Sequence, residues 1–130
     1  GEAFLQQTAA FTAASFKGPY GLNAAEFSNS SPFNDQQTAI ALCSVAATPG
    51  SDATSVSGFA DNANGVPDFA ITGSFTPNAA GVFAGTLAGF DPASRTTPGN
   101  FTLYLVDGTQ GILIETDKTL LTLGRLQSLQ

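Results

Sequence analysis

Apolar side chains recur at every second position in several short segments of the chain, which is the pattern of β-strands. In residues 100–107, one face of an extended strand would carry Phe101, Leu103 and Leu105. The opposite face, which includes Tyr104, is also fairly apolar. We therefore expect this strand to be central in its sheet or to be covered on its outer side.

Gly, Pro, Asn and Asp separate these segments, as they do in many-stranded antiparallel folds. The Asp107-Gly108 pair after the clearest strand predicts a hairpin. We predict an all-β fold, a single antiparallel meander of about eight strands that closes into a small or flattened barrel, because closure removes exposed sheet edges. A two-sheet β-sandwich is the alternative. The predicted strands are Tyr20–Phe27, Thr38–Ala46, Ala53–Ala60, Asp68–Thr76, Val82–Phe90, Asn100–Asp107, Ile112–Thr116 and Leu120–Gln127.

The amino-terminal segment differs from the rest, being rich in Ala and Gln with no Gly or Pro after Gly1. We predict an amino-terminal arm over residues 1–16 and an antiparallel β domain over residues 17–130. Residues 12–16 could form one short helical turn. The arm can dock on its own domain or, as an added strand, on a neighbouring subunit. The candidate assembly residues of the arm are Phe4, Leu5, Phe11 and Phe16.

Composition and charge exclude several partners. Charged residues make up 11% of the chain, against about 25% in an average domain, and the net charge is −6. The four cations are scattered, so they form no basic patch for nucleic acid, and the acidity disfavours anionic lipid. No apolar run approaches the roughly 20 residues of a membrane helix, so membrane insertion is not expected. The Gly, Ala, Thr and Asn content indicates an extracellular or cell-surface location.

Most catalytic chemistry lacks its side chains here. The chain has no His and one Cys, which removes imidazole bases, His-dependent triads and thiolate metal sites. Glu115 and Asp117 alternate along one predicted strand, and a carboxylate pair can hydrolyse a glycoside, but acids at a hairpin end are ordinarily solvated. We predict no enzymatic activity and no required cofactor. Cys43 is either a small buried apolar residue or half of an intermolecular disulfide.

One segment resembles a calcium loop. In residues 60–68, oxygen-bearing side chains alternate around a Gly, and calcium takes about six to eight oxygen ligands. The position of the leading acid in such a loop is Ala60, so a plain Asn/Gly turn is the alternative. The candidate ligands are Asn62, Asn64 and Asp68.

Several strand and turn motifs together resemble a known module. They are Phe16-x-Gly18-x-Tyr20-x-Leu22, Ile71-Thr-Gly-Ser-Phe-Thr76, Asn78-x-x-Gly81, Phe101-x-x-Tyr104-Leu-Val-Asp107, Ile112-Leu-Ile-Glu-Thr-Asp117 and Leu123-Gly-Arg-Leu-Gln127. The pattern is similar to an uncharacterised secreted β-repeat module of acidobacterial and related environmental bacterial surface proteins. The resemblance covers about residues 16–127 and implies a role in extracellular architecture. The Gly18-x-Tyr20 opening also faintly resembles the first strand of lipocalins.

Two functions follow from these observations. The first is a non-catalytic extracellular structural protein that assembles with copies of itself, through the arm, into a fibre or surface layer. The alternative is a lipocalin-like barrel that binds a small apolar ligand or a glycan, since the chain contains 11 Phe residues that could line a cup.

Overall fold

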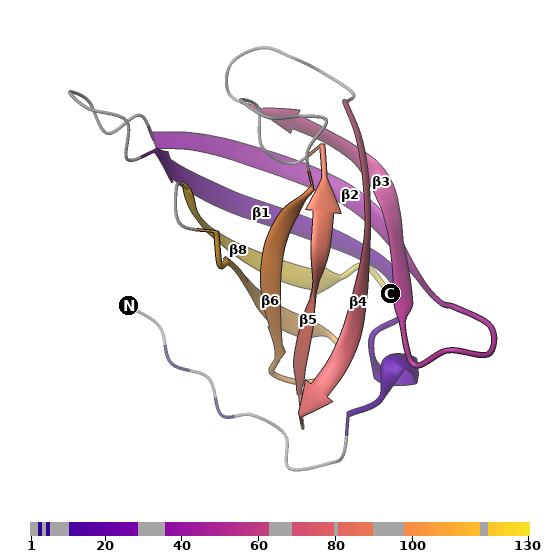
Figure 1. Ribbon diagram of the computed structural model, residues 1–130. Coiled ribbons are helices and arrows are strands. Elements are labelled where there is room, and N and C mark those ends of the chain that lie inside the picture. The colour runs from indigo at the N-terminus through magenta and orange to yellow at the C-terminus, as the bar shows by residue number, and fades with distance from the viewer. Residues whose placement is uncertain are drawn as a thin grey trace.

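The computed structural model describes residues 3, 5, 11–28, 36–62, 69–79, 81–89, 98–117 and 120–130. Eight antiparallel strands follow one another around a ring, and the last strand pairs with the first (Figure 1). The predicted meander and its closure into a barrel are thus confirmed, and the two-sheet sandwich is wrong. The strands are β1 Gly18–Ser28, β2 Gln36–Ala47, β3 Thr54–Asn62, β4 Phe69–Ala79, β5 Val82–Ala88, β6 Gly99–Leu105, β7 Gln110–Glu115 and β8 Leu120–Ser128.

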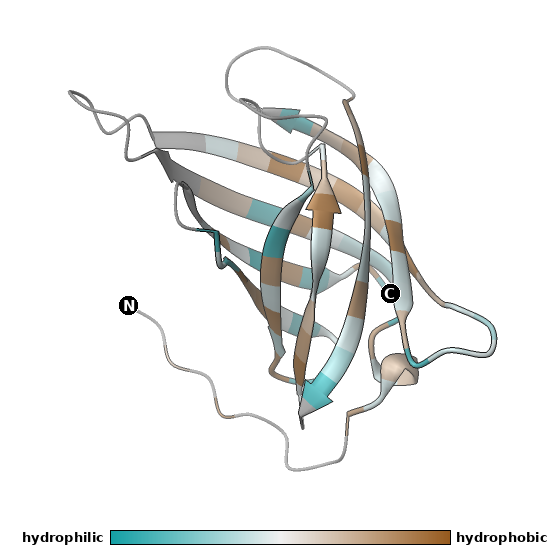
Figure 2. Ribbon diagram, viewed as in Figure 1, coloured by the Kyte–Doolittle hydropathy of each residue, from teal (hydrophilic) through white to brown (hydrophobic). Residues whose placement is uncertain are grey.

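Hydrophobic and hydrophilic residues alternate along the strands, as the banding of Figure 2 shows. The exposed fractions of the side chains separate a buried inner face from a mixed outer face. On β6, Phe101, Leu103 and Leu105 all lie inside and are almost fully buried, as the sequence predicts. Tyr104 lies on the outer side and remains 43% exposed. In the part of the chain that the structure describes, no helix has the length and apolar character needed to cross a membrane.

Glycines allow the strands to bend sharply into so narrow a barrel. A Cβ atom at Gly85 would lie 2.1 Å from the carbonyl oxygen of Ser74, and one at Gly58 would lie 2.1 Å from that of Leu42. Both positions therefore require a residue without a side chain. Such close approaches are typical of the corners at which small barrels turn.

Residues 11–16 pack against one end of the barrel. A single 3-10 turn, η1 (Ala13–Ser15), precedes β1 and confirms the predicted helical turn. Phe16 then enters the barrel, where it is 1% exposed, and its ring lies 5.2 Å from Tyr20, 6.2 Å from Phe75 and 5.9 Å from Phe83. The contacts with Phe75 and Phe83 are edge-to-face, an arrangement that holds aromatic clusters together. Phe16 is thus part of the core of its own barrel.

The same end is tied to the link between β6 and β7. The Tyr20 hydroxyl donates a hydrogen bond of 2.9 Å to the carbonyl oxygen of Gly108. Within that link, the Asp107 carboxylate accepts hydrogen bonds from Thr109 and from the Gln110 backbone, which hold the pKa of Asp107 below its usual value. The Asp-Gly hairpin predicted from the sequence is confirmed.

Candidate interaction surfaces on the outer wall

Side chains pack the described interior of the barrel. The hydrophobic core residues range from fully buried to 8% exposed, the highest value belonging to Ala39. Two buried polar side chains lie across β7 and β8, where the Thr122 hydroxyl donates a hydrogen bond to the Glu115 carboxylate. An eight-stranded barrel is just wide enough for side chains to fill it, and the described interior follows that rule.

Strand β2 exposes its largest side chains. Ala39 and Ala41 point inward and are buried, whereas Ile40 and Leu42 point outward and are 65% and 63% exposed. This strand thus leaves two large hydrophobic side chains in contact with solvent. Covering such a side chain completely would contribute about 1.5–3 kcal/mol.

The exposed side chains of β2 belong to a continuous apolar surface, which we name face A and define by Ile40, Leu42, Phe59 and Leu129. Leu42 pairs directly with Phe59, which is 61% exposed. On its other side Leu42 pairs with Gly21, and Leu129 lies beside Gly21 within 3.5 Å of the position of a Cβ atom. Face A thus extends from β3 across β2 and β1 to the carboxy-terminal residues.

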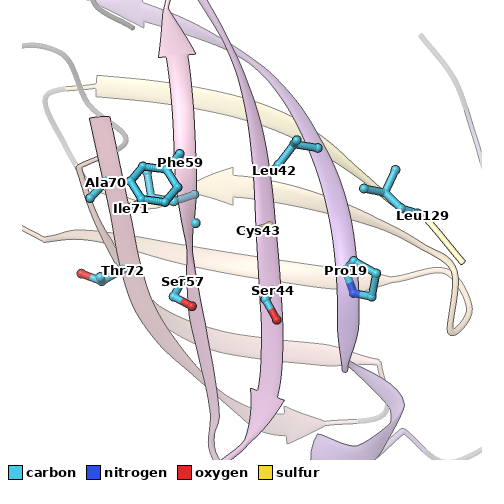
Figure 3. A pocket seen from close by; sticks show the side chains of 11 residues that line it. Pro19, Leu42, Cys43, Ser44, Ser57, Phe59, Ala70, Ile71, Thr72 and Leu129 are labelled. Carbon is cyan, nitrogen blue, oxygen red and sulfur yellow. The ribbon is translucent and has the colours of Figure 1, made fainter. Parts of the chain in front are cut away.

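A shallow groove runs along face A (Figure 3). Its volume is about 590 Å³, and all of its eleven lining residues are uncharged. Figure 3 shows Leu42, Phe59 and Leu129 projecting into it from separate segments of the chain. Clefts of this size and apolar character bind small molecules or the side chains of a partner. The lining residues are Pro19, Leu42, Cys43, Ser44, Ser57, Gly58, Phe59, Ala70, Ile71, Thr72 and Leu129.

A second apolar surface covers β5 to β8, and we name it face B. Tyr104 on β6 pairs with Ile112, and Leu123 on β8 pairs with Ile114. Leu123 is 51% exposed, and the two isoleucines are half-buried. In the sequence, the apolar outer side of this region predicts a central or covered strand; the structure leaves Tyr104 exposed there. Face B is defined by Val82, Tyr104, Ile112, Ile114 and Leu123.

Polar residues separate the two faces. Asn23 on β1 pairs with Ile40 of face A and with Arg125 on β8, and Arg125 pairs in turn with Ile112 of face B. The Arg125 guanidinium also donates a hydrogen bond of 3.4 Å to the Gln110 side chain. At the other margin of face A, the exposed Asp61 pairs with Ile40. Face A is therefore bordered by an acid, and face B by a cation.

The residues predicted from sequence to carry assembly lie in different environments. Phe16 is buried in the core, and Phe11 packs against that core. Leu5 is 96% exposed, and Phe4 lies outside the described residues. The arm therefore contributes to its own barrel through Phe16 and Phe11, and its contact with a neighbouring subunit stays a prediction.

The predicted calcium segment lies mostly outside the described residues. Asn64 and Asp68 fall there, and Asn62 ends strand β3. Within the described ranges, no group of three or more His, Cys, Asp or Glu residues is placed to hold a metal ion. Calcium binding by residues 60–68 stays a prediction.

The side chains of Cys43 and Asp117, the remaining candidates for chemistry, are held by hydrogen bonds within the barrel. The Cys43 thiol is buried, donates a hydrogen bond of 3.5 Å to the carbonyl oxygen of Tyr20, and has its pKa raised by burial to about 11. Asp117 accepts two hydrogen bonds of 2.7 Å from Asn100, which lower the pKa of its carboxyl group. The burial of Cys43 favours its interpretation as a core residue over an intermolecular disulfide.

No protein-family model matches the chain, and no curated protein is similar to it. Solved β-barrels are similar in structure. A redesigned β-barrel, b11L5F_LGL, aligns with a TM-score of 0.67 at 15% identity and covers 95% of this chain and 100% of its own. The redesigned barrel mFAP1 bound to DFHBI gives 0.67 at 14% identity, with 89% and 97% coverage. EF1p2_mFAP2b bound to DFHBI gives 0.64 at 13% identity, with 90% and 96% coverage. At these identities the similarity establishes the barrel fold.

Proposed function

We propose that this protein is a non-catalytic extracellular structural subunit that assembles with copies of itself into a fibre or surface layer. The observation that carries the proposal is the orientation of β2, which buries Ala39 and Ala41 and exposes Ile40 and Leu42. Large exposed apolar patches on soluble domains mark interaction sites. In a structural assembly, a neighbouring subunit covers such a patch permanently.

Charge favours the apolar faces as the place of contact. With a net charge of −6, two copies repel each other over most of their surface. The groove of face A is lined by uncharged residues, so its burial against a second copy removes apolar area from water without desolvating a charge. The composition and the resemblance to secreted repeat modules support the extracellular location.

Removal of the exposed apolar side chains of face A tests the proposal. The double variant Leu42→Thr/Phe59→Thr keeps β-favouring residues at both strand positions and removes the apolar surface. In size-exclusion chromatography with light scattering, we expect the wild-type chain to exceed its 13.2 kDa subunit mass and the variant to elute at that mass. A variant that assembles as the wild type does would contradict a role for face A.

The matched control is Leu5→Thr, which removes an equally large apolar side chain from the arm. Leu5 is 96% exposed and belongs to neither face. Assembly through face A leaves this variant associated. If Leu5→Thr alone dissociates the particles, the contact belongs to the arm, as the sequence predicts, and the structural role stands on a different surface.

A second candidate function is binding of a small apolar molecule or a glycan. The groove of about 590 Å³ is in the size range of small-molecule sites, and it offers an exposed Phe59 ring beside the Ser57 and Thr72 hydroxyls. Two structurally similar designed barrels are bound to the small molecule DFHBI. Because the described interior is packed, the outer groove supports this function better than the cup predicted from the sequence.

The ligand hypothesis predicts saturable binding of an apolar fluorophore such as Nile red. Phe59→Thr should weaken that binding at least tenfold, and Tyr104→Thr, on the opposite wall, should leave it unchanged. Fluorescence that rises linearly without saturation, or that is equally reduced by both substitutions, would exclude a specific site in the groove.

A further inference from the structure

The centres of faces A and B lie on opposite sides of the barrel, and their margins approach each other at β8, which carries Leu123 of face B and is followed by Leu129 of face A. Face A is centred on β2 and β3, and face B is centred on β6 and β7. In the closed ring of eight strands these centres are four strands apart, which is half of the circumference. In Figure 1, β5 and β6 lie in the foreground and β1 and β2 run behind them. A single contact with a copy of the same size therefore cannot cover the centres of both faces.

Symmetry then distinguishes two kinds of assembly. A two-fold dimer joins the same patch on both subunits, so it would bury one face and leave the other in water. Contact between face A of one copy and face B of the next buries both faces of every internal subunit. Because the centres of the two faces point in opposite directions, repetition of this contact extends a chain of subunits instead of closing a pair.

The charges that border the faces favour the unlike contact. Asp61 borders face A, and Arg125 borders face B. Contact of A with A brings two Asp61 carboxylates toward the same interface, and contact of B with B does the same for two Arg125 guanidinium groups. Contact of A with B sets opposite charges at the margin, which gives orientation and specificity to an apolar interface.

Resting on the proposed structural function, we infer that the occupant of face A is face B of a second copy of this chain. Assembly is heterologous and head-to-tail, with Leu42 and Phe59 of one subunit packed against Tyr104 and Leu123 of the next. The product is an open chain of subunits. In this arrangement the aromatic Tyr104 and Phe59 lie within the same interface, where aromatic side chains contribute strongly to binding.

Mixing two assembly-defective variants tests the inference. The face A variant is Leu42→Thr/Phe59→Thr, and the face B variant is Tyr104→Thr/Leu123→Thr. Each keeps one intact face, so each alone is expected to be a monomer. An equimolar mixture is expected to form a 1:1 heterodimer of twice the 13.2 kDa subunit mass and nothing larger, because one competent A–B contact is available per pair. Light scattering after size exclusion measures both.

The alternatives give different results. A face B variant that assembles as well as the wild type, or a mixture that stays monomeric, overturns the head-to-tail contact and leaves the structural function intact. A wild-type chain that is monomeric at every concentration overturns the proposed function itself. Circular dichroism melts check that each variant is folded. Where a double variant is destabilised, Leu42→Thr and Tyr104→Thr are mixed instead, with the same expected 1:1 complex.

Discussion

Phe16 joins the amino-terminal segment to the barrel. From the sequence, Phe16 is assigned to the arm with Phe4, Leu5 and Phe11, although Phe16 also begins the motif Phe16-x-Gly18-x-Tyr20-x-Leu22 that leads into the first strand. In the structure its ring lies among Tyr20, Phe75 and Phe83, so one residue outside the strands completes the core at the closed end. The boundary at residue 16 thus separates two sequence patterns but not two packing units, because Phe16 packs in the core of the barrel.

Truncation of this side chain should be costly. Phe16→Ala removes a buried aromatic ring and leaves a cavity, so we expect a loss of about 3–5 kcal/mol in the free energy of unfolding. Urea denaturation followed by circular dichroism measures the loss. Leu5→Ala, at a 96% exposed position, is the control and should change stability by less than about 0.5 kcal/mol. Equal stability of the two variants would contradict the closing role of Phe16.

Buried ionisable groups predict a loss of stability at high pH. Burial raises the pKa of the Cys43 thiol from 9.0 to about 11, and it also raises the pKa of Tyr20. Between pH 9.0 and about 11, the thiol of Cys43 loses its proton in the unfolded chain and keeps it in the folded chain. Unfolding is therefore increasingly favoured as the pH rises through this interval. We expect the melting temperature to fall from pH 9 to pH 11, and to fall less in Cys43→Ala. A melting temperature independent of pH over this interval would contradict the burial of the thiol.

At the scale of the strands, glycine positions set the curvature. The Cβ position at Gly85 lies 2.1 Å from the Ser74 carbonyl oxygen, whereas at Gly108, in the β6–β7 link, the nearest atom is the Ser15 carbonyl oxygen at 3.9 Å. Any side chain at Gly85 must push β4 and β5 apart. Gly108 has room for a methyl group.

We therefore expect Gly85→Ala to destabilise the barrel by about 1–3 kcal/mol, the usual cost of overpacking. Gly108→Ala serves as the matched control and should be close to neutral. Thermal melts of both variants make the comparison. If the two melt at the same temperature, close packing at the Gly85 corner does not determine the curvature.

Alternation in the sequence predicts the strands well, but for one strand it does not predict which side faces the barrel interior. On β6, Phe101, Leu103 and Leu105 alternate with Thr102 and Tyr104, and the inner face follows directly. On β2 both faces are apolar, so the period of two does not say whether Ala41 or Leu42 is inside.

The register of β2 decides the question. Ala41 pairs with Leu22 on one side and with Ala60 on the other, all three facing an interior with little free space. At Gly58 the neighbouring β2 backbone approaches so closely that a Cβ atom would lie 2.7 Å from the Cα atom of Cys43. In this part of β2 the small Ala39 and Ala41 face the interior, and the large Ile40 and Leu42 are turned outward. Face A therefore arises from the tight curvature of the barrel, which a local pattern does not contain.

At the scale of the whole molecule, closure of the barrel limits how copies can join. The ring of paired strands leaves no free sheet edge among the described strands, so backbone pairing between subunits has no obvious template there. In the proposed assembly, side chains on the outer wall supply the contacts. In the assembly that we propose, two apolar faces with centres on opposite sides give each subunit a contact in two directions, as a fibre requires.

Sedimentation velocity of the unmodified chain over a wide concentration range tests this assembly most directly. Head-to-tail association through faces A and B predicts sedimentation coefficients that rise continuously with concentration, without a plateau at two subunits. A single species of 13.2 kDa at every concentration would contradict self-assembly, and a plateau at twice that mass would contradict the open chain in favour of a closed dimer.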